Sequence, residues 1–384
     1  MFGRTSGGAA VVLLLGVRAV VLISVIVDVP DFQSAASERY RVIAETPGRP
    51  YRDFDVEYAP GELAIAEAVG SGTSDTARGL LAVIAFSGDI VAFASIRRGW
   101  GADAARRYLW LGLPLLIFIY RRADLATVAL TVTALMLARR HREEAGGLAM
   151  AAAFLTRVWP VILAPIWAIE RNLRSLWVFA VAASSGAIAW VAYGGLDGIG
   201  QVSSFRGARG WELESSVGVV VWALTDEHRF EAGANRTGIV PAWAGPAMSA
   251  SLVAIFAIIW LRARSSRSEP AGPPALAAVA ALLVVSPLLS PQYASWLLPW
   301  AAIAGVGGRR FTIVASVPIA LTGAVVTGWS LDLGLGAGPD QTILFLRNCS
   351  LVAIVVTYLV WTRPDLPEVP ARRGYAAPTP RRAR

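Results

Sequence analysis

The sequence predicts an all-α polytopic integral membrane protein, and two observations support that fold class. Of the 384 residues, 55% are hydrophobic and only 16% are charged, whereas soluble domains contain about a quarter charged residues. In addition, apolar runs recur along the whole chain instead of clustering in one segment. Both features indicate a series of helices that cross a bilayer and leave little surface in water.

Crossing a bilayer takes roughly 20 apolar residues in a helix, or somewhat fewer where the helix is short. Arg18 interrupts the first apolar run and no small-residue cleavage site follows it, so we expect a retained helix rather than a signal peptide. We expect about 10–13 crossings in total. The candidate runs are 8–27, 79–97, 104–120, 123–138, 146–169, 175–193, 242–262, 275–290, 294–307, 311–329 and 341–361.

The placement of arginine predicts the topology, because cytoplasmic loops of membrane proteins are enriched in basic residues. All 35 basic residues are arginine and most flank the apolar runs, so the net charge of +8 reflects topology rather than nucleic-acid binding. The segments predicted to be cytoplasmic are Arg97 with Arg98, 138–144, 262–268, Arg309 with Arg310, and 362–384. The last is a Pro- and Arg-rich tail that we expect to be disordered. The membrane domain then covers 1–361, with outer segments at 28–78, 195–240, near 290 and at 330–340.

The number of crossings poses a parity problem. Eleven crossings that start inside would end outside, which contradicts the basic tail. The run 146–169 is the best candidate for a split or re-entrant segment, because basic clusters flank both of its ends and "RVWP" (157–160) breaks it. The short runs 61–69 and 216–224 are alternatives that could supply one more crossing.

The outer segment 28–78 opens with "DVPD", which places Asp28 and Asp31 at the membrane–water boundary. A carboxylate beside apolar surface has a raised pKa, which suits a general base. The alternative is that both acids only end a helix in the headgroup region. The next stretch, 34–45, has polar and apolar residues at helical spacing and predicts an amphipathic helix on the bilayer surface.

The stretch "GRPYRDFDVEYAPGELAI" (48–65) is dense in charged and aromatic residues. Aromatic rings stack on sugar faces and arginine binds phosphate oxygens, so the composition favours a site for a sugar and a phosphate. Prolines and a glycine predict an extended course for this part. An ordinary polar connection is the alternative.

Three further segments contain polar groups next to apolar runs. Arg157 lies inside 147–167, where a buried cation indicates either an anion ligand or a snorkelling side chain. The segment 204–224 gathers Arg206, Arg209, Glu212 and Glu214 before an apolar run, either at a site or in a solvated loop. In "SPLLSPQYASWLLPW" (286–300), prolines break a helix at membrane depth, which is tolerated where the chain lines a cavity or packs in protein. An aromatic belt explains Tyr293 and Trp296 but not Gln292.

Other residues limit the possible chemistry. A single cysteine, Cys349, and two histidines exclude thiolate and histidine-rich metal sites. No P-loop, GxGxxG, HExxH or GxSxG motif occurs. Asp89 lies within an apolar run, where an acid is either functional or paired with an arginine. Asp124 marks a short outer turn.

Four of these segments resemble elements of a known family, in the same order along the chain. "GRPYRDFDVEYAPGELAI" resembles the "G-x-P-Y-x-D-F-x-V-E-Y-P-P" loop of actinobacterial polyprenol-phosphate-sugar glycosyltransferases of the GT-C superfamily. These are the membrane mannosyltransferases of family eighty-seven, relatives of the enzymes that extend phosphatidylinositol mannosides. "TRVWP", "RGWELESS" and "SPQYASWLLPW" resemble that family's basic-x-x-Pro, "R-G-x-x-x-E-S" and "S-P-Q-Y-x-x-W-x-x-P" elements. The chain departs from the family pattern at two positions: Ala59 replaces the first proline of "EYPP", and Arg157 replaces the lysine that is usual in the basic-x-x-Pro element.

The resemblance implies a GT-C type fold and an inverting transfer of a sugar, most simply mannose, from a polyprenyl-phosphate donor to a lipid-linked or glycan hydroxyl. The active site would face the outside of the plasma membrane, and neither a metal nor another cofactor would be required. Asp31 is favoured as the base, with Asp28 as its alternative. The implied donor-phosphate residues are Arg157, Arg206, Arg209, Gln292 and Tyr293, and the implied acceptor or sugar residues are Tyr51, Arg52, Asp53, Glu57, Tyr58 and Glu214.

Two other classes of protein remain possible from the sequence. A transporter or flippase of a lipid-linked sugar would also need broken helices and intramembrane charge. No paired internal repeat is visible between the two halves of the chain, which disfavours it. A membrane scaffold without activity would make the acids and Arg157 individually dispensable.

Overall fold

In the computed structural model, helices follow the predicted apolar runs. The structure describes residues 5–27, 35–204, 209–231, 234–266, 268–306, 308–331 and 341–361. The all-α polytopic architecture that the sequence predicts is confirmed by six described helices that are long and apolar enough to cross a membrane. They are α1 (Thr5–Val27), α4 (Ser74–Trp100), α10 (Leu173–Ser204), α12 (Ala244–Arg264), α15 (Arg309–Leu331) and α16 (Gln341–Trp361).

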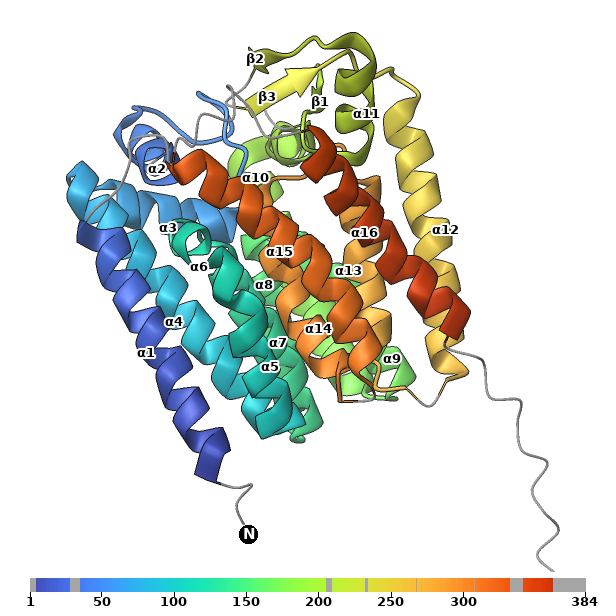
Figure 1. Cartoon of the computed structure of the whole chain (residues 1–384). Helices are drawn as coiled ribbons and strands as arrows, with labels where there is room; N and C mark the ends of the chain where they lie inside the picture. Colours follow the sequence, from blue (N-terminus) through green and yellow to red (C-terminus); the bar gives the residue numbers. More distant parts are fainter. Residues whose placement is uncertain are drawn as a thin grey trace, which may run out of the picture.

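Shorter helices complete the bundle between these six (Figure 1). They are α5 (Ala102–Gly112) continued by η2 (Leu113–Leu115) and α6 (Leu116–Ile119), α7 (Asp124–Arg139), α8 (Glu143–Thr156), η3 (Trp159–Leu163) with α9 (Pro165–Ile169), α13 (Pro273–Val285), and η4 (Pro291–Leu297) with α14 (Leu298–Ala304). Along the described residues the chain therefore passes between the two ends of the bundle twelve times: α1, α4, α5–α6, α7, α8, η3–α9, α10, α12, α13, η4–α14, α15 and α16. Because this number is even, Thr5 and Trp361 lie at the same end.

The predicted break in 146–169 is confirmed, and it resolves the parity problem. Helix α8 ends at Thr156, Arg157 has an extended backbone (φ −145°, ψ 131°), and Pro160 follows in η3. The first residues of α8 and α10 are neighbours, since the Ser175 hydroxyl donates a hydrogen bond to the Glu143 carbonyl oxygen (2.9 Å). The segment from α8 to α9 therefore runs to the opposite end of the bundle and back. It makes two short passes where the sequence shows one apolar run.

One end of the bundle, called the loop end below, is covered by the elements that do not cross (Figure 1). These are α2 (Ala35–Glu45), α3 (Pro60–Gly70), α11 (Ser216–Thr225) and a small antiparallel sheet of β1 (Trp211–Glu212), β3 (Ala234–Thr237) and β2 (Arg229–Glu231), in that order. The runs 61–69 and 216–224 thus form α3 and α11 and do not supply an additional crossing.

The helix predicted over 34–45 is present as α2, and its position on the bilayer surface stays a prediction. Its buried residues Ser37, Tyr40 and Ile43 pack against protein, in a cluster shared with α3 and α4. The approach to α3 is so close that a Cβ atom at Gly70 would lie 2.2 Å from the Tyr40 carbonyl oxygen. Glycine is required at this point because any side chain would push the two helices apart.

The opposite end is called the arginine end, because it contains the predicted basic segments that the structure describes; the tail 362–384 lies outside the described residues. Arg139 forms an ion pair with Glu269 (2.9 Å), and Arg140 donates to the Arg98 carbonyl oxygen (3.3 Å). Arg107 donates to the carbonyl oxygen of Ala302 (2.9 Å). The basic loops that the sequence assigns to one side of the membrane are therefore together in space, at the end that also holds both described termini.

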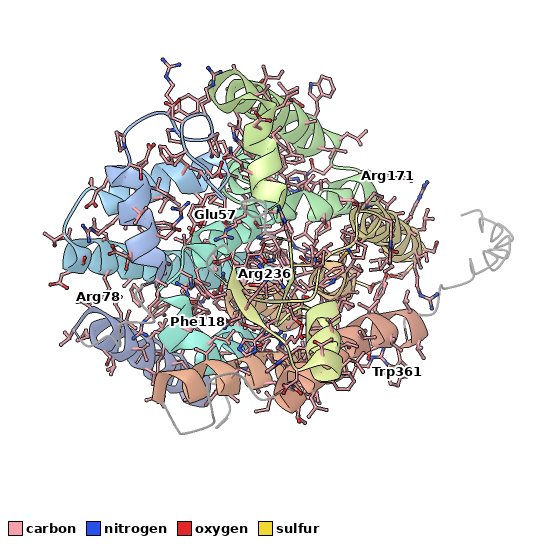
Figure 2. All side chains as sticks on the ribbon, turned by 90° about the horizontal axis from the view of Figure 1, so that it is seen from above. Glu57, Arg78, Phe118, Arg171, Arg236 and Trp361 are labelled. Carbon is pink, nitrogen blue, oxygen red and sulfur yellow. The ribbon has the colours of Figure 1, made fainter. Side chains whose placement is uncertain are left out.

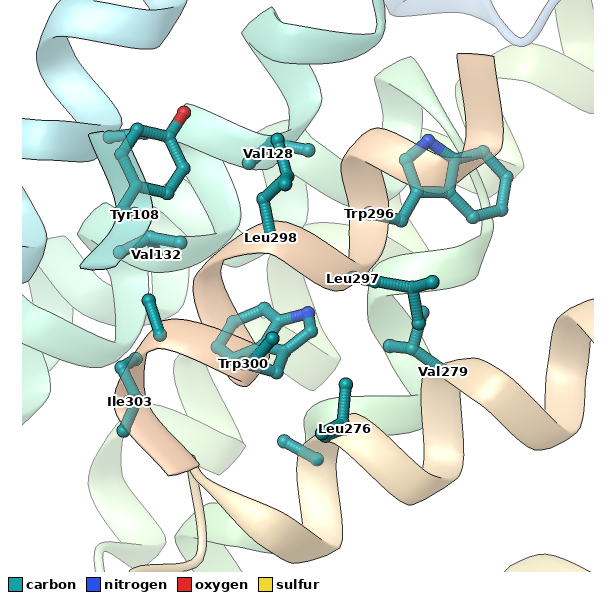
Figure 3. Close-up of a cluster of buried hydrophobic side chains, with 14 of the residues drawn as sticks. Tyr108, Val128, Val132, Leu276, Val279, Trp296, Leu297, Leu298, Trp300 and Ile303 are labelled. Carbon is teal, nitrogen blue, oxygen red and sulfur yellow. The ribbon is translucent and has the colours of Figure 1, made fainter. Parts of the chain in front are cut away.

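The centre of the bundle is built from α13 and α14, which are enclosed by the other helices. Small residues of α13 such as Ala275, Ala278 and Ala281 are buried, and they let neighbouring helices approach closely. Leu276 and Trp300 pack in the same cluster (Figure 3). Because protein surrounds most of α13, it does not need the roughly 20 residues that a lipid-facing crossing requires.

The intramembrane acid Asp89 is paired with an arginine, as one of the two predicted alternatives has it. Its carboxylate lies 2.9 Å from Arg18 Nε and accepts hydrogen bonds from the hydroxyls of Tyr108 (2.7 Å) and Tyr120 (2.6 Å). Arg18 also donates to the Leu109 carbonyl oxygen (2.9 Å). Helix α1 otherwise exposes an apolar surface, and helices in lipid have little hydrophobic reason to associate. This polar cluster therefore fixes α1 to the bundle.

Candidate active site

The four sequence elements that resemble the family motifs meet at the loop end. Figure 2 looks down onto this end and shows Glu57 and Arg236 near its middle and Arg78 towards its rim. The first element reaches the second through Glu62 and Arg157. The second reaches the fourth through two stacked indoles, Trp159 and Trp296. The third is joined to the fourth by hydrogen bonds of Glu212.

Arg157 is the centre of a small charged cluster. Its Nη2 donates to Glu62 Oε1 (2.7 Å) and its Nε lies 2.6 Å from Glu62 Oε2. Its Nη2 is also 3.4 Å from Asp124 Oδ2, and its guanidinium lies 6.0 Å from the centre of the Tyr58 ring. The helical break therefore places a cation between the N-terminal turns of α3 and α7, where two carboxylates balance it.

The Asp124 carboxylate connects this cluster to an aromatic stack. Trp296 Nε1 donates to Asp124 Oδ1 (2.9 Å). The Trp296 ring is stacked between Trp159, with centroids 5.0 Å apart, and Tyr293, at 4.2 Å. Tyr293 is half-buried, so the stack reaches towards the surface of the loop end. A guanidinium can bind a phosphate, and an aromatic ring beside it offers an apolar face on which a sugar can stack.

Glu212 joins β1 to the "SPQY" turn. Its Oε1 accepts a hydrogen bond from the Ser290 hydroxyl (2.8 Å), and its Oε2 accepts one from the Leu289 backbone N–H (2.6 Å). Burial raises the pKa of Glu212, while these hydrogen bonds and nearby Arg236 oppose the change. The side chain is buried, so its role is to hold the third and fourth elements in a fixed relation.

Glu214, predicted as an acceptor or sugar residue, is also buried. Its Oε2 lies 2.7 Å from Arg347 Nη1 on α16, and its carbonyl oxygen accepts from Arg347 Nη2 (2.6 Å) and Asn348 Nδ2 (3.1 Å). Burial raises the pKa of Glu214 to about 7, with Arg347 acting in the opposite direction. Glu214 thus attaches the small sheet to the helical bundle.

In the first loop, Tyr51, Arg52 and Asp53 form a tight turn. Tyr51 has a positive φ of 69°, and its backbone N–H donates to the Phe54 carbonyl oxygen (3.0 Å). Asp53 Oδ2 accepts from the Arg49 N–H (2.6 Å), and Arg52 Nη2 donates to the Ala192 carbonyl oxygen (2.9 Å). The extended course predicted for this segment is therefore wrong at 50–54, because the hydrogen bonds of Tyr51 and Asp53 fold the chain back on itself.

Glu57 and Tyr58 follow this turn and point into the loop end. Glu57 is buried and receives hydrogen bonds from Arg39 Nε (3.0 Å) and Nη2 (2.7 Å). Tyr58 packs edge-on against Tyr40 (centroids 5.4 Å apart). The Tyr40 hydroxyl donates to Glu62 Oε1 (2.8 Å), so α2, the loop and α3 share one network.

The remaining predicted residues are placed less centrally or lie outside the described part of the chain. Arg209 is exposed, and its backbone N–H donates to Glu231 Oε1 (2.7 Å). Gln292 is half-buried next to Tyr293, and its carbonyl oxygen accepts from the Ser295 hydroxyl (2.7 Å). The candidate bases Asp28 and Asp31, together with Arg206, fall outside the described residues.

Sequence reasoning missed two acids of the central cluster. Glu62 lies in the first quoted motif but was given no role there, because it belongs to an apolar run. Asp124 was predicted only to mark an outer turn. Burial and the nearby Asp124 raise the pKa of Glu62, Arg157 lowers it, and the resulting value is about 7. An acid at the start of an apolar helix was the one signal that could have singled out each of them.

Within the described residues, no group of three or more His, Cys, Asp or Glu side chains is placed to hold a metal ion. An apolar crevice opens beside the fourth element, between η4, α15 and α16. It is lined by Leu289, Ser290, Pro318 and Leu351, with Arg347 among the polar groups.

Neither a protein-family model nor a curated protein matches the chain. Among solved structures, the chain is similar to ArnT from Cupriavidus metallidurans in the apo state, with a TM-score of 0.48, 20% identity, and coverage of 92% of this chain and 71% of ArnT. It is also similar to ArnT from the same organism bound to undecaprenyl phosphate, with a TM-score of 0.45, 16% identity, and coverage of 91% and 76%. Similarity at this level assigns no role to any residue.

Proposed function

We propose that this protein is a membrane glycosyltransferase of the GT-C kind. It transfers a sugar, mannose in the first instance, from a polyprenyl-phosphate donor to a hydroxyl of a lipid-linked or glycan acceptor. One observation supports the proposal above the others: four elements that are far apart in the sequence form a single connected network at the loop end. A scaffold has no need to bring a guanidinium, an aromatic stack and several buried acids to one place.

The reaction needs a base and cations at the membrane face. A bond forms between the acceptor oxygen and the anomeric carbon while the bond from that carbon to the phosphate oxygen breaks. The acceptor proton passes to a carboxylate, for which Asp31 or Asp28 is proposed. Negative charge accumulates on the departing lipid phosphate and needs nearby cations. Arg157, Arg206 and Arg209 are proposed for this role.

Other residues are proposed to bind the two substrates. Gln292 and Tyr293 would position the donor, with the Tyr293–Trp296 stack as the surface for the sugar. Tyr51, Arg52, Asp53, Glu57, Tyr58 and Glu214 would shape the acceptor side. Because the leaving group is a lipid phosphate held by side-chain cations, the chemistry requires no nucleotide and no metal.

The distribution of arginine supports the orientation. Basic loops favour the cytoplasmic side, and they gather at the end of the bundle opposite the network. We therefore place the loop end at the outer face of the plasma membrane and both termini at the cytoplasmic face.

The test is transfer of radiolabelled mannose from polyprenyl-phosphate mannose into lipid by the purified full-length protein. Wild type, Asp28→Asn and Asp31→Asn are compared, and Asp103→Asn at the arginine end is the control. We expect transfer by wild type and by the control, and loss of about 10²-fold or more in one of the two other variants. If wild type is inactive with mannose and arabinose donors across a panel of lipid acceptors, the proposal is wrong and a flippase assay is next.

A further inference from the structure

Arg157 is the accessible member of its ion pair with Glu62. The Arg157 side chain is 18% exposed, whereas the side chains of Glu62 and Asp124 are 1% and 0% exposed. An anion arriving from the loop end therefore meets the guanidinium first. It does not meet a free cation, however, because Glu62 already lies against both Nε and Nη2.

The titratable groups that face Glu62 come from several of the elements around α3. Tyr40 belongs to α2, Glu57 and Tyr58 to the first loop, and Asp124 to α7. Arg157 lies at the helical break and Tyr293 lies on η4, and Arg122, which precedes α7, lies near Asp124 and Arg157. The guanidinium of Arg157 thus has two carboxylates in contact, and a phosphate anion would be a third negative group in the same place. Like charges this close repel strongly where water is excluded.

We propose that Glu62 and the phosphate of the lipid donor compete for Arg157, and that binding of the phosphate is coupled to uptake of one proton by Glu62. The coupling leaves the net charge of the cluster unchanged, since one negative group arrives and one is neutralised. No covalent bond changes, and the proton comes from water. The inference rests on the proposed function only in naming a polyprenyl phosphate as the anion.

The position of Glu62 makes this exchange inexpensive near neutral pH. Burial raises the pKa of its carboxyl to about 7, against the influence of Arg157. At such a value the two protonation states of the group are close in free energy, whereas an exposed glutamate would hold a proton only in acid. The hydrogen bond from Tyr40 favours the charged form, so it sets where the exchange occurs.

The experiment measures binding of farnesyl methyl phosphate to the purified full-length protein by calorimetry between pH 6 and pH 8. This probe is a phosphodiester and keeps one negative charge throughout that range. For wild type, the affinity should fall about tenfold from pH 6 to pH 8. For Glu62→Gln it should be independent of pH, and at pH 8 it should equal or exceed that of wild type at pH 6.

Two further variants sharpen the test. Glu67→Gln changes an exposed acid on the same helix, and it should keep the pH dependence of wild type. Tyr40→Phe removes the donor to Glu62, so the midpoint of the pH dependence should move to higher pH. The proposal is overturned if Glu62→Gln keeps the wild-type pH dependence or, while folded, does not bind. An unmoved midpoint in Tyr40→Phe also overturns it.

The binding assay and the transfer assay test the two proposals independently. Proton-coupled binding of the probe without sugar transfer would contradict the proposed function and leave the competition at Arg157 intact. Transfer of mannose together with pH-independent binding would support the proposed function and contradict the competition at Arg157.

Discussion

Trp296 donates its indole N–H to the buried carboxylate of Asp124 across 2.9 Å, although 172 positions separate the two residues in the sequence. This hydrogen bond holds the aromatic stack beside the Arg157 cluster. It joins the part of the loop end suited to a sugar ring with the part suited to a phosphate.

The first prediction concerns this hydrogen bond. Asp124→Asn and Trp296→Phe should each reduce the free energy of unfolding by about 1–3 kcal/mol, because each disturbs a buried hydrogen bond to a charged group. The double variant should lose less than the sum, with a coupling energy of about 1 kcal/mol or more. Unfolding of the detergent-solubilised protein by denaturant gives these values.

Trp300→Phe is the matched control for this double-mutant comparison. Trp300 is fully buried, and its indole nitrogen has no hydrogen-bond partner among the described residues. Its substitution should show no coupling to Asp124→Asn. A coupling energy near zero between Asp124→Asn and Trp296→Phe would mean that the hydrogen bond adds nothing to stability.

The second prediction concerns the ion pair inside the bundle. Arg18→Met should cost about 3–5 kcal/mol of stability, since it leaves the buried carboxylate of Asp89 without its cation. The double variant Arg18→Met with Asp89→Asn should recover part of this loss. Tyr120→Phe, which removes one hydrogen bond to this carboxylate only, should cost about 1.5–3 kcal/mol. Thermal unfolding of the purified protein measures all three, and a double variant less stable than Arg18→Met alone would contradict the explanation.

The third prediction compares two glycines. Gly70→Ala should destabilise the protein by about 1–3 kcal/mol and lower transfer activity, because the new Cβ would meet the backbone of α2. Gly79→Ala on α4 meets no atom within 4 Å and should leave stability unchanged or raise it slightly. Melting temperature and transfer rate are the two measurements. Equal behaviour of the two variants would show that α2 and α3 can separate at no cost.

The fourth prediction concerns pH and the attachment of the small sheet. The pKa of Glu214 is raised to about 7 in the folded protein, so the folded state binds more protons than the unfolded state between pH 4.5 and 7. Stability should therefore fall as pH rises through this range, by up to about 3 kcal/mol, and level off above it. Hydrogen exchange in 209–231, corrected for intrinsic rates, should follow this trend in wild type. In Glu214→Gln the dependence should weaken, and an unchanged dependence would assign it to another group.

Much of the fold could be predicted because its signals are local. An apolar run identifies a crossing by its length, and "RVWP" marks a break because Pro160 cannot continue a helix. The even number of passes followed once that break was placed in the chain. The turn at Tyr51 was missed, since no local rule predicts a positive φ for a tyrosine that is followed by arginine.

The partners within the site could not be predicted, because they are set by how distant segments pack. Glu62 and Arg157 are 95 positions apart, and nothing in the segment around either residue identifies the other as its partner. An acid in an apolar run signals that a partner exists, as it did for Asp89, but only the packing of α1 against α4 identifies Arg18. The positions of the motifs were thus predictable, whereas their connections were not.

The hydrogen bonds of Glu212 to residues 289 and 290 also determine when the loop end can be completed during synthesis. Helices enter the membrane in the order in which the ribosome makes them, and nine of the twelve passes precede η4. Until that tenth pass arrives, the Asp124 carboxylate lacks its indole donor and β1 lacks its anchor. A nascent chain that stops before residue 290 therefore contains nine passes but no complete site. The site forms only after most of the chain has been inserted.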